Sequence, residues 1–273
     1  MTHLKRFSIP RTWRMSRKSE KFAVTPSPGP HGKMECIPLR VVLRDVLGYA
    51  DNCREARSVL SQGKILVDRR PRKSSRYPAG LMDVIEIADT RQKFRVTVGP
   101  GGLELESIDD SDAGWKICRI RGKTTIRGGI CQLNLHDGRN ITVKKDTYRV
   151  GDSVKISLPD QKILKQYSLE KGSHALITAG RNMGTWGSIK EIEERKHSLE
   201  KSTITLDTRD GEIKTLRKYI FVAEMPARHK AGHEPAGEKP EKNEGKPAEP
   251  RHAPKGEKAS RPKTKPSAAK EKK

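Results

Sequence analysis

Apolar residues between positions 38 and 50 recur at the spacing of one helix face. At steps of three and four residues they are Leu39, Val42, Leu43, Val46, Leu47 and Ala50. Pro38 suits the first turn of a helix, because an N–H at that position has no partner within the helix. Arg40 and Arg44 fall on the opposite side. The pattern therefore predicts a helix with one apolar and one basic face.

A second, shorter helix is predicted to follow and to end at Gly63, since glycine commonly follows the last helical residue. Asp51 or Asn52 can cap its start with a side-chain oxygen. Arg54 and Arg57, three positions apart, share its exposed face. The two helices can thus present their arginines together.

After the second helix the hydrophobic period changes from helical to alternating. Residues 64–68 and 82–87 are predicted as short strands, and the polar run 69–76 between them carries five basic residues. The order helix, turn, helix, strand, basic loop, strand defines a small α+β unit, for which we expect the boundaries 38–94.

The following segments have the pattern of strands joined by tight turns. Asp-Gly pairs at 137–138 and 210–211 lie between alternating apolar runs, which is a strong signal for a hairpin. The glycine-rich residues 99–102 also predict a hairpin-like turn. We expect two small, mostly antiparallel β domains, at 95–170 and 171–226.

Residues 1–37 are predicted to be a basic N-terminal extension. In the first 33 residues, eight Lys and Arg face the single acid Glu20, and large apolar side chains are interleaved with them. Two interpretations stay open. In one, the segment folds onto a partner, with Trp13 and Phe22 stacking or anchoring; in the other, these two rings cover the core of the first domain, and the two are compatible.

Residues 227–273 have a composition unlike the rest of the chain. They contain no Val, Ile, Leu, Met, Phe, Tyr or Trp, and 14 Lys and Arg face 7 Glu. Nothing in such a segment offsets the entropy lost on ordering, which predicts a disordered tail rich in Lys, Pro and Glu. Both non-specific RNA contact and simple solvation stay open for it.

The charge of the whole chain favours a nucleic-acid partner. Its 273 residues carry 57 Lys and Arg against 34 Asp and Glu, a formal charge of +23. Cations that neutralise phosphates release counterions, and a charge spread along the chain is unlike that of a membrane-surface helix. No apolar run approaches the ~18 residues that span a bilayer. The basic start lacks the apolar stretch of a secretory signal, so we expect a cytoplasmic protein.

The four cysteines do not form a C-x-x-C pair, which argues against a zinc site. Disulfides are rare in a reducing compartment, so we expect small buried side chains at these positions. No metal, no cofactor and no small-molecule substrate is predicted. No segment has the pattern of a catalytic domain, so the chain is predicted not to be an enzyme.

The helix–turn–helix–strand unit resembles the alpha-L RNA-binding motif of ribosomal proteins, pseudouridine synthases and some tRNA synthetases. The residues that carry the match are Ala56, Gly63, Ile65, Val67, Asp83, Val84 and Ile85. The resemblance implies a basic face that suits RNA phosphates and grooves recognised by shape. The alternative is an ordinary small α+β unit with solvated arginines.

Residues 171–189 resemble a KOW motif, which occurs in ribosomal proteins and transcription elongation factors. This strand–loop–strand needs glycines where the backbone turns sharply or approaches RNA closely. Arg181, Asn182 and Met183 are expected at the loop tip, with Trp186 beside them. The alternative is a glycine-rich hairpin without a ligand.

The order of these parts resembles one family, the archaeal/eukaryotic-type ribosomal protein four of the small subunit, over about residues 1–225. Local matches to the family are Lys5-Arg6, Pro10, Trp13, Gly29-Pro30-His31, the run 77–85 and Ile220-Phe221-Val222. The resemblance implies a structural protein that binds small-subunit ribosomal RNA beside neighbouring small-subunit proteins, with no membrane and no catalysis.

The expected fold is therefore α+β and multi-domain. An alpha-L RNA-binding unit precedes two small, mostly antiparallel β domains, of which the second is a KOW-type small barrel, and a disordered tail follows. The expected RNA-binding residues are Lys5, Arg6, Arg11, Trp13, Arg14, Arg40, Arg44, Arg54, Arg57, Lys64, Arg69, Arg70, Arg72, Lys73, Arg181, Asn182 and Trp186. Two alternatives stay open: an RNA-modifying enzyme with the alpha-L unit as adaptor, and a KOW-class transcription factor.

Overall fold

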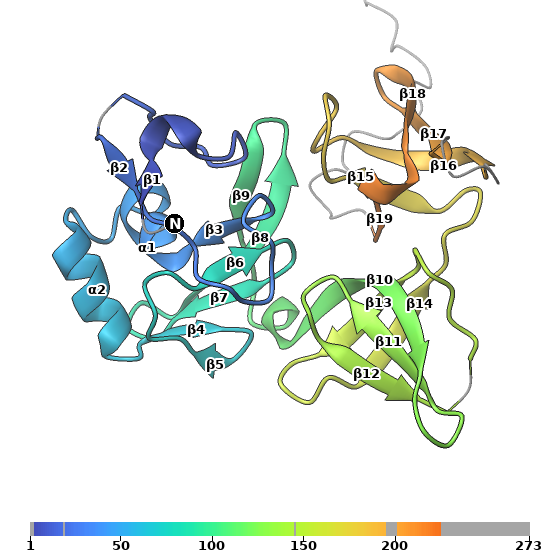
Figure 1. The fold of residues 1–273 in the computed structure, drawn as a ribbon, viewed down its shortest axis with the longest axis horizontal. Helices are drawn as coiled ribbons and strands as arrows, with labels where there is room; N and C mark the ends of the chain where they lie inside the picture. The colour runs from blue at the N-terminus through green and yellow to red at the C-terminus, as the bar shows by residue number, and fades with distance from the viewer. Residues whose placement is uncertain (1–2, 19, 145, 195–200, 225–273) are drawn as a thin grey trace, which may run out of the picture. The chain divides into compact units, whose positions relative to one another are not determined.

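Strands dominate the part of the chain that the structure, a computed structural model, describes: residues 3–18, 20–144, 146–194 and 201–224. Three five-stranded antiparallel sheets follow one another along the chain (Figure 1). The predicted α+β class is confirmed in its coarse form, mostly strand with few helices. The predicted tail, 227–273, lies outside the described residues.

The first sheet has the strand order β5-β4-β7-β8-β9. Its strands are β4 (Ile65–Val67), β5 (Arg70–Pro71), β7 (Val84–Ile87), β8 (Gln92–Gly99) and β9 (Gly102–Ser107). The expected boundary between residues 94 and 95 falls inside β8. Because β8 pairs with β7 on one side and β9 on the other, this hairpin belongs to the first sheet and not to the central β domain.

The first helical segment is shorter than predicted and changes its hydrogen bonding midway. It runs through α1 (Leu39–Val41) into a π-helical turn, η2 (Val42–Val46), where the Leu47 N–H donates to the Val42 carbonyl over 2.9 Å. A π turn holds more residues than an α turn and rotates the side chains that follow it. Val46, predicted on the apolar face, is the last residue of this turn and is 40% exposed.

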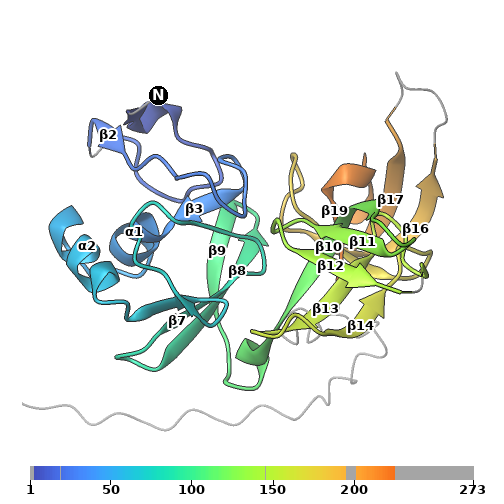
Figure 2. The ribbon, with the colours of Figure 1, turned by 60° about the horizontal axis from the view of Figure 1, so that its bottom comes forward.

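The second helix, α2 (Cys53–Ser61), begins and ends where its sequence predicts. Asn52 is its N-cap residue, and the Glu55 carboxylate accepts the backbone N–H groups of Asp51 at 3.0 Å and Asn52 at 3.3 Å. Gly63 follows the helix with a φ of +75°, which glycine adopts at little cost. Helices α1 and α2 lie side by side in both views (Figures 1 and 2).

The N-terminal segment lies on the first core. A short pair of strands, β1 (Leu4–Lys5) and β2 (Phe22–Ala23), brackets it. Trp13 is only 3% exposed and its indole N–H donates to the Cys36 carbonyl over 2.6 Å. The interpretation that this ring covers the first domain's core is therefore confirmed for Trp13. It is wrong for Phe22, whose ring is exposed.

Two further strands extend this core. They are β3 (Cys36–Pro38) and β6 (Pro78–Gly80), which pair in antiparallel fashion.

The four cysteines are free, and three of them, Cys36, Cys118 and Cys131, are buried, as predicted.

The second sheet has the order β12-β11-β10-β13-β14 and a core of its own. Its strands are β10 (Trp115–Thr125), β11 (Cys131–Leu135), β12 (Asn140–Val143), β13 (Ser153–Ser157) and β14 (Ile163–Tyr167). The hairpin predicted at the first Asp-Gly pair is confirmed between β11 and β12, where Gly138 has a φ of +74°.

The third sheet has the order β18-β17-β16-β15-β19. Its strands are β15 (His174–Ile177), β16 (Trp186–Glu193), β17 (Thr203–Thr208), β18 (Gly211–Leu216) and β19 (Ile220–Val222). The second Asp-Gly pair forms the predicted hairpin, since Thr208 and Gly211 are partners across β17 and β18. Closure of this sheet into a barrel stays a prediction.

A buried lysine joins the first two sheets. Lys116, on β10, is 1% exposed. Its ammonium lies 2.7 Å from Asp68 and 3.0 Å from Asp83, which flank strands of the first sheet, and 2.6 Å from Asp137 in the β11–β12 turn. Burial opposes the charge on Lys116, but Asp83 and its neighbours outweigh this and raise the pKa of the ammonium.

Two further side chains complete this group, which we call the Lys116 cluster: Lys116, Asp68, Asp83, Asp137, Arg139 and His31. Arg139 pairs with Asp68 and, at 3.2 Å, with Asp137. His31 Nε2 lies 2.9 Å from Asp83 Oδ2. Burial opposes a charge on His31, but Asp83 outweighs it and raises the pKa of the imidazole. The N-terminal segment is thereby tied to both sheets.

No helix among the described residues is both long and apolar enough to cross a membrane.

We expect Lys116→Met to lower the free energy of unfolding by about 3–5 kcal/mol, because it leaves buried carboxylates without their cation. Lys190→Met is the matched control, since Lys190 also pairs with a carboxylate, that of Glu212, but both side chains are more than half exposed. The control should change stability by less than about 1 kcal/mol. Urea unfolding followed by circular dichroism measures both, and equal losses would contradict a central role for the cluster.

Candidate RNA interface

Exposed cations gather on α2 and on the loop that follows β5. We define the basic face as Arg40, Arg54, Arg57, Lys73 and Arg76. Within the described residues, no carboxylate lies within ion-pairing distance of any of them. Arg54, Arg57, Lys73 and Arg76 are exposed, and Arg40 is half-buried. The face therefore carries positive charge that the protein itself does not balance.

The charges of the basic face are close enough to influence one another. Burial lowers the pKa of the Arg40 guanidinium, and the positive charges of Arg57, Arg44 and Arg76 lower it further. The Arg40 Nε is buried without a hydrogen-bond partner among the described residues. A bound anion would relieve this repulsion, which is what a phosphate-binding surface requires.

The loop of the basic face is held in place by its own contacts. The Arg72 guanidinium stacks 4.6 Å above the Tyr77 ring, and the Arg40 N–H donates to the Ser75 carbonyl over 3.1 Å. The Lys73 side chain lies over Gly63, at the end of α2. Arg72 thus acts as a support inside the loop, while Lys73 remains exposed.

The tight turn between β4 and β5 presents two more predicted residues. Asp68 and Arg69 both have positive φ, 51° and 61°, as a two-residue turn of type I′ between antiparallel strands requires. Arg69 lies 3.7 Å from Glu86, whereas Arg70 is exposed and has no carboxylate partner among the described residues. Lys64, the last predicted residue of this unit, pairs with an exposed aspartate at 2.8 Å.

The predicted residues of the N-terminal segment divide into exposed and internal ones. Lys5 and Arg11 are exposed, and Arg14 pairs with Glu104 at 2.8 Å while remaining half exposed. Arg6 and Trp13 are each 3% exposed. The expectation that Trp13 stacks on RNA is corrected, because its ring is used in the core and its N–H is already bonded.

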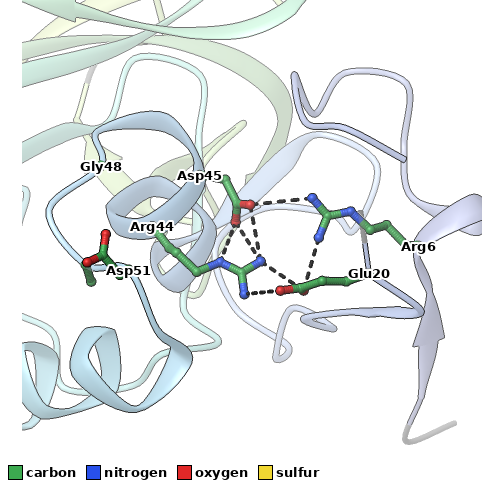
Figure 3. Close-up of a pocket in the computed structure, with 7 residues that line it drawn as sticks. Arg6, Glu20, Arg44, Asp45, Gly48 and Asp51 are labelled. Carbon is green, nitrogen blue, oxygen red and sulfur yellow. Dashed lines mark hydrogen bonds and ion pairs between the residues drawn. The ribbon is translucent and has the colours of Figure 1, made fainter. Parts of the chain in front are cut away.

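Arg6 is internal because it belongs to an ion-pair network (Figure 3). Its guanidinium lies 3.1 Å from Glu20 and 3.5 Å from Asp45. Arg44 approaches the same two carboxylates, each at 3.1 Å. Burial opposes the charge of Arg44, but Asp45, then Cys53 and Glu20, outweigh it and raise its pKa. Unlike the basic face, these two arginines are balanced by acids of the same chain.

The loop between β15 and β16 has the geometry predicted for its glycines. Gly180 and Gly184 have φ of +102° and +87°. The Gly184 N–H donates to the Ile177 carbonyl over 2.8 Å, which closes the loop. Arg181 and Asn182 lie between these glycines and are exposed, so they are the part of this loop that can reach a ligand.

The other side of this loop packs inward. Met183 and Trp186 pack against the first core, and Trp186 is half-buried. A Cβ on Gly184 would lie 2.3 Å from the carbonyl carbon of Gly99, the last residue of β8 before the β8–β9 turn. Trp186 was expected beside the loop tip, among the residues that contact RNA. This expectation is corrected, because its side chain packs against the first core.

Sequence reasoning missed two residues here. Arg76 is the last cation of the 69–76 run and could have been included with Lys73 on that ground. Glu20 was noted only as the single acid of the first 33 residues, and that isolation was a usable signal. A lone carboxylate among eight cations is a natural ion-pair partner.

Cys118, His136 and Asp137 are the one group among the described residues with metal-ligand character, and their donor atoms lie within 4.8 Å of one another. The donors are already used. Asp137 accepts from Lys116, and the ring nitrogens of His136 bond the Arg119 N–H at 3.2 Å and the Leu81 carbonyl at 3.1 Å. Burial raises the pKa of the Cys118 thiol well above its usual value. The group does not fit a metal ion.

Two family models match the chain. The model of ribosomal family S4e matches residues 90–163, and the RS4NT domain matches residues 2–34.

Relatives that match about four fifths of the chain are ribosomal proteins of the small subunit. The small ribosomal subunit protein eS4 of Methanothermobacter thermautotrophicus is 46% identical over 222 residues, which are 81% of this chain and 91% of the relative. That of Staphylothermus marinus is 43% identical over 231 residues, 80% of this chain and 90% of the relative. The crystal structure of the 30S ribosomal protein S4e from Thermoplasma acidophilum is similar with a TM-score of 0.60 and 30% identity, over 69% of this chain and 94% of that one.

Gly184→Ala should displace the β15–β16 loop, because its Cβ would overlap the backbone of the β8–β9 turn. Gly172→Ala is the matched control: its φ is +86°, and nothing lies within 4 Å of the added Cβ. We expect the control to cost about 1–2 kcal/mol for the left-handed backbone alone, and Gly184→Ala to cost about 1–3 kcal/mol more. Urea unfolding gives the loss of stability for both variants, and equal losses would show that the β15–β16 loop does not pack against the β8–β9 turn.

Proposed function

The chain belongs to the ribosomal S4e family, and from that membership we propose that it is a structural component of the small ribosomal subunit that binds ribosomal RNA. Members of this family are ribosomal structural proteins, and the chain is not an enzyme. The alternative of an RNA-modifying enzyme is therefore set aside. Small-subunit RNA and neighbouring small-subunit proteins are the proposed partners, with a ribosome-associated, cytoplasmic location.

The basic face is the observation that carries RNA binding. Other cations of the described chain, such as Lys64 and Lys93, lie beside carboxylates. The arginines of α2 do not. Burial, and then the charges of Arg57, Arg44 and Arg76, lower the pKa of Arg40, so an external anion near these arginines would stabilise its charged form. RNA phosphates supply that charge, and the gain includes the release of their counterions.

Three surfaces contribute to the proposed contact. The first is the basic face with Arg70. The second is the exposed part of the N-terminal segment, Lys5 and Arg11. The third is the tip of the β15–β16 loop, which we propose to be the KOW loop of a small barrel. Cations of this kind fix position on a backbone, and shape supplies the specificity.

We propose that the chain consists of an alpha-L unit, a central β domain and a KOW-type unit. No role is assigned to residues 227–273.

Co-sedimentation tests the proposed function directly. In sucrose gradients of a lysate at low salt, the protein should migrate with the small-subunit fractions. Raising the salt should release it, because the interaction is dominated by phosphates. Recovery with RNA polymerase instead would favour a KOW-class transcription factor and overturn the proposal.

Arg54→Ala combined with Arg57→Ala should weaken binding to small-subunit RNA more than removal of residues 227–273. The double variant removes two unbalanced cations of the basic face, so we expect the affinity to fall by about tenfold or more. It should also make the affinity less sensitive to salt. The slope of log affinity against log salt concentration should become shallower by about 0.7 for each single-strand phosphate that the variant no longer neutralises. Filter binding across a salt series measures both quantities, and a greater weakening on tail removal would contradict the assignment of the basic face.

A further inference from the structure

We propose that Arg6 and Arg44 form a binding site for one phosphate of the RNA backbone, and that Glu20 occupies this site in the free protein. The inference rests on the proposed function and deepens it, because it names a phosphate site that the predicted cations alone did not reveal. Figure 3 shows the four side chains that build it.

The geometry of Glu20 is that of a bound oxyanion. Its Oε2 lies 3.1 Å from Nη1 of Arg6, and its Oε1 lies 3.1 Å from Nη1 of Arg44. A second nitrogen of Arg44, Nη2, donates to Oε2 over 3.2 Å. Two guanidinium groups from separate segments of the chain therefore converge on one carboxylate, the arrangement that arginine pairs offer to phosphates.

A phosphodiester can replace this carboxylate without changing the charge balance. The network holds two guanidinium groups and two carboxylates, those of Asp45 and Glu20. A phosphodiester and a carboxylate each carry one negative charge, and the planar fork of arginine matches both. The exchange leaves the network neutral, so it needs no further cation.

The two carboxylates differ in how easily they can leave. Asp45 is 14% exposed and follows Arg44 directly in the chain, where it bonds to that guanidinium over 3.1 Å. Glu20 is 49% exposed. The carboxylate of Glu20 is thus already partly hydrated and can move into water, while the incoming phosphate keeps the buried guanidinium groups of Arg6 and Arg44 paired with an anion. Asp45 then remains as the fixed counterion that orients both arginines.

The arginines are ordered before any ligand arrives. Arg6 is 3% exposed, its Nε donates to the Ser16 carbonyl, and its backbone N–H donates to the Lys21 carbonyl over 3.1 Å. Arg44 also bonds Cys53 Sγ over 3.0 Å. Because these side chains are held already, a phosphate that binds them does not have to order them.

The site is accessible and lies next to the basic face. An open hollow of about 320 Å³ is lined by Arg6, Glu20, Arg44, Asp45, Gly48, Ala50 and Asp51. Asp51 lies away from the two guanidinium groups in Figure 3, so it does not compete for them. Arg44 is also close enough to Arg40, a residue of the basic face, for its charge to lower the pKa of that guanidinium.

Glu20→Gln tests the site, with Glu212→Gln as the matched control. Glu212 pairs with Lys190 and is 56% exposed, so the control removes the same charge at similar exposure, away from Arg6 and Arg44. We expect Glu20→Gln to bind small-subunit RNA about three- to tenfold more tightly than Glu212→Gln, because the phosphate no longer competes with a carboxylate. In an Arg44→Gln background this gain should disappear.

Inorganic phosphate provides a second readout that does not require RNA. At fixed ionic strength it should raise the melting temperature of Glu20→Gln more than that of the wild type or Glu212→Gln. Equal RNA affinity for the two glutamine variants, or a gain that persists without Arg44, would overturn the inference. If wild type fails to bind small-subunit RNA while phosphate still protects Glu20→Gln, the oxyanion site stands and the proposed function fails.

Discussion

The ammonium of Lys116, enclosed by three aspartates, is the interaction on which the arrangement of the described chain depends. Removing a charge from water is costly, and only close, well-directed partners offset that cost. Here the partners come from the turn after β4, the turn before β7 and the turn after β11. A shift of either sheet would leave a buried charge without a partner, so the cluster fixes the sheets far more strictly than apolar contact does. His31 extends the same constraint to the N-terminal segment.

Features set by neighbouring residues could be predicted from the sequence. The Asp-Gly hairpins and the start and end of α2 depend on the backbone preferences of a few adjacent residues, and each is present as predicted. The assignment of β8 to the first sheet depends on its pairing with β7, which local alternation does not reveal. The burial of Trp13 likewise depends on tertiary packing, and the π turn of η2 has no signal in the hydrophobic pattern of residues 38–50. A buried Lys116 could not be predicted, because its carboxylates lie 21 to 48 residues away in sequence.

In the candidate interface, too, some features could be predicted from neighbouring residues and others depend on the fold. Exposure of the α2 arginines follows from the helical period, and the loop between β15 and β16 follows from its glycines. What the sequence could not reveal is which cations are already balanced. Arg44 and Glu20 are 24 residues apart, and only the fold brings them together. Net charge therefore overstates the charge available to RNA, and the unpaired cations of the basic face describe it better.

The position of Lys116 in the chain bears on how the protein is made. Asp68 and Asp83 emerge from the translating ribosome well before Lys116, and Asp137 and Arg139 emerge later still. Domains generally fold as units from the N-terminus during synthesis. When the first sheet has been synthesised, His31 is already available to Asp83, but Asp68 has no cation of the cluster until Lys116 follows. We therefore expect completion of the cluster to be a late step of folding on the nascent chain, because Asp137 and Arg139 are its last members to be synthesised.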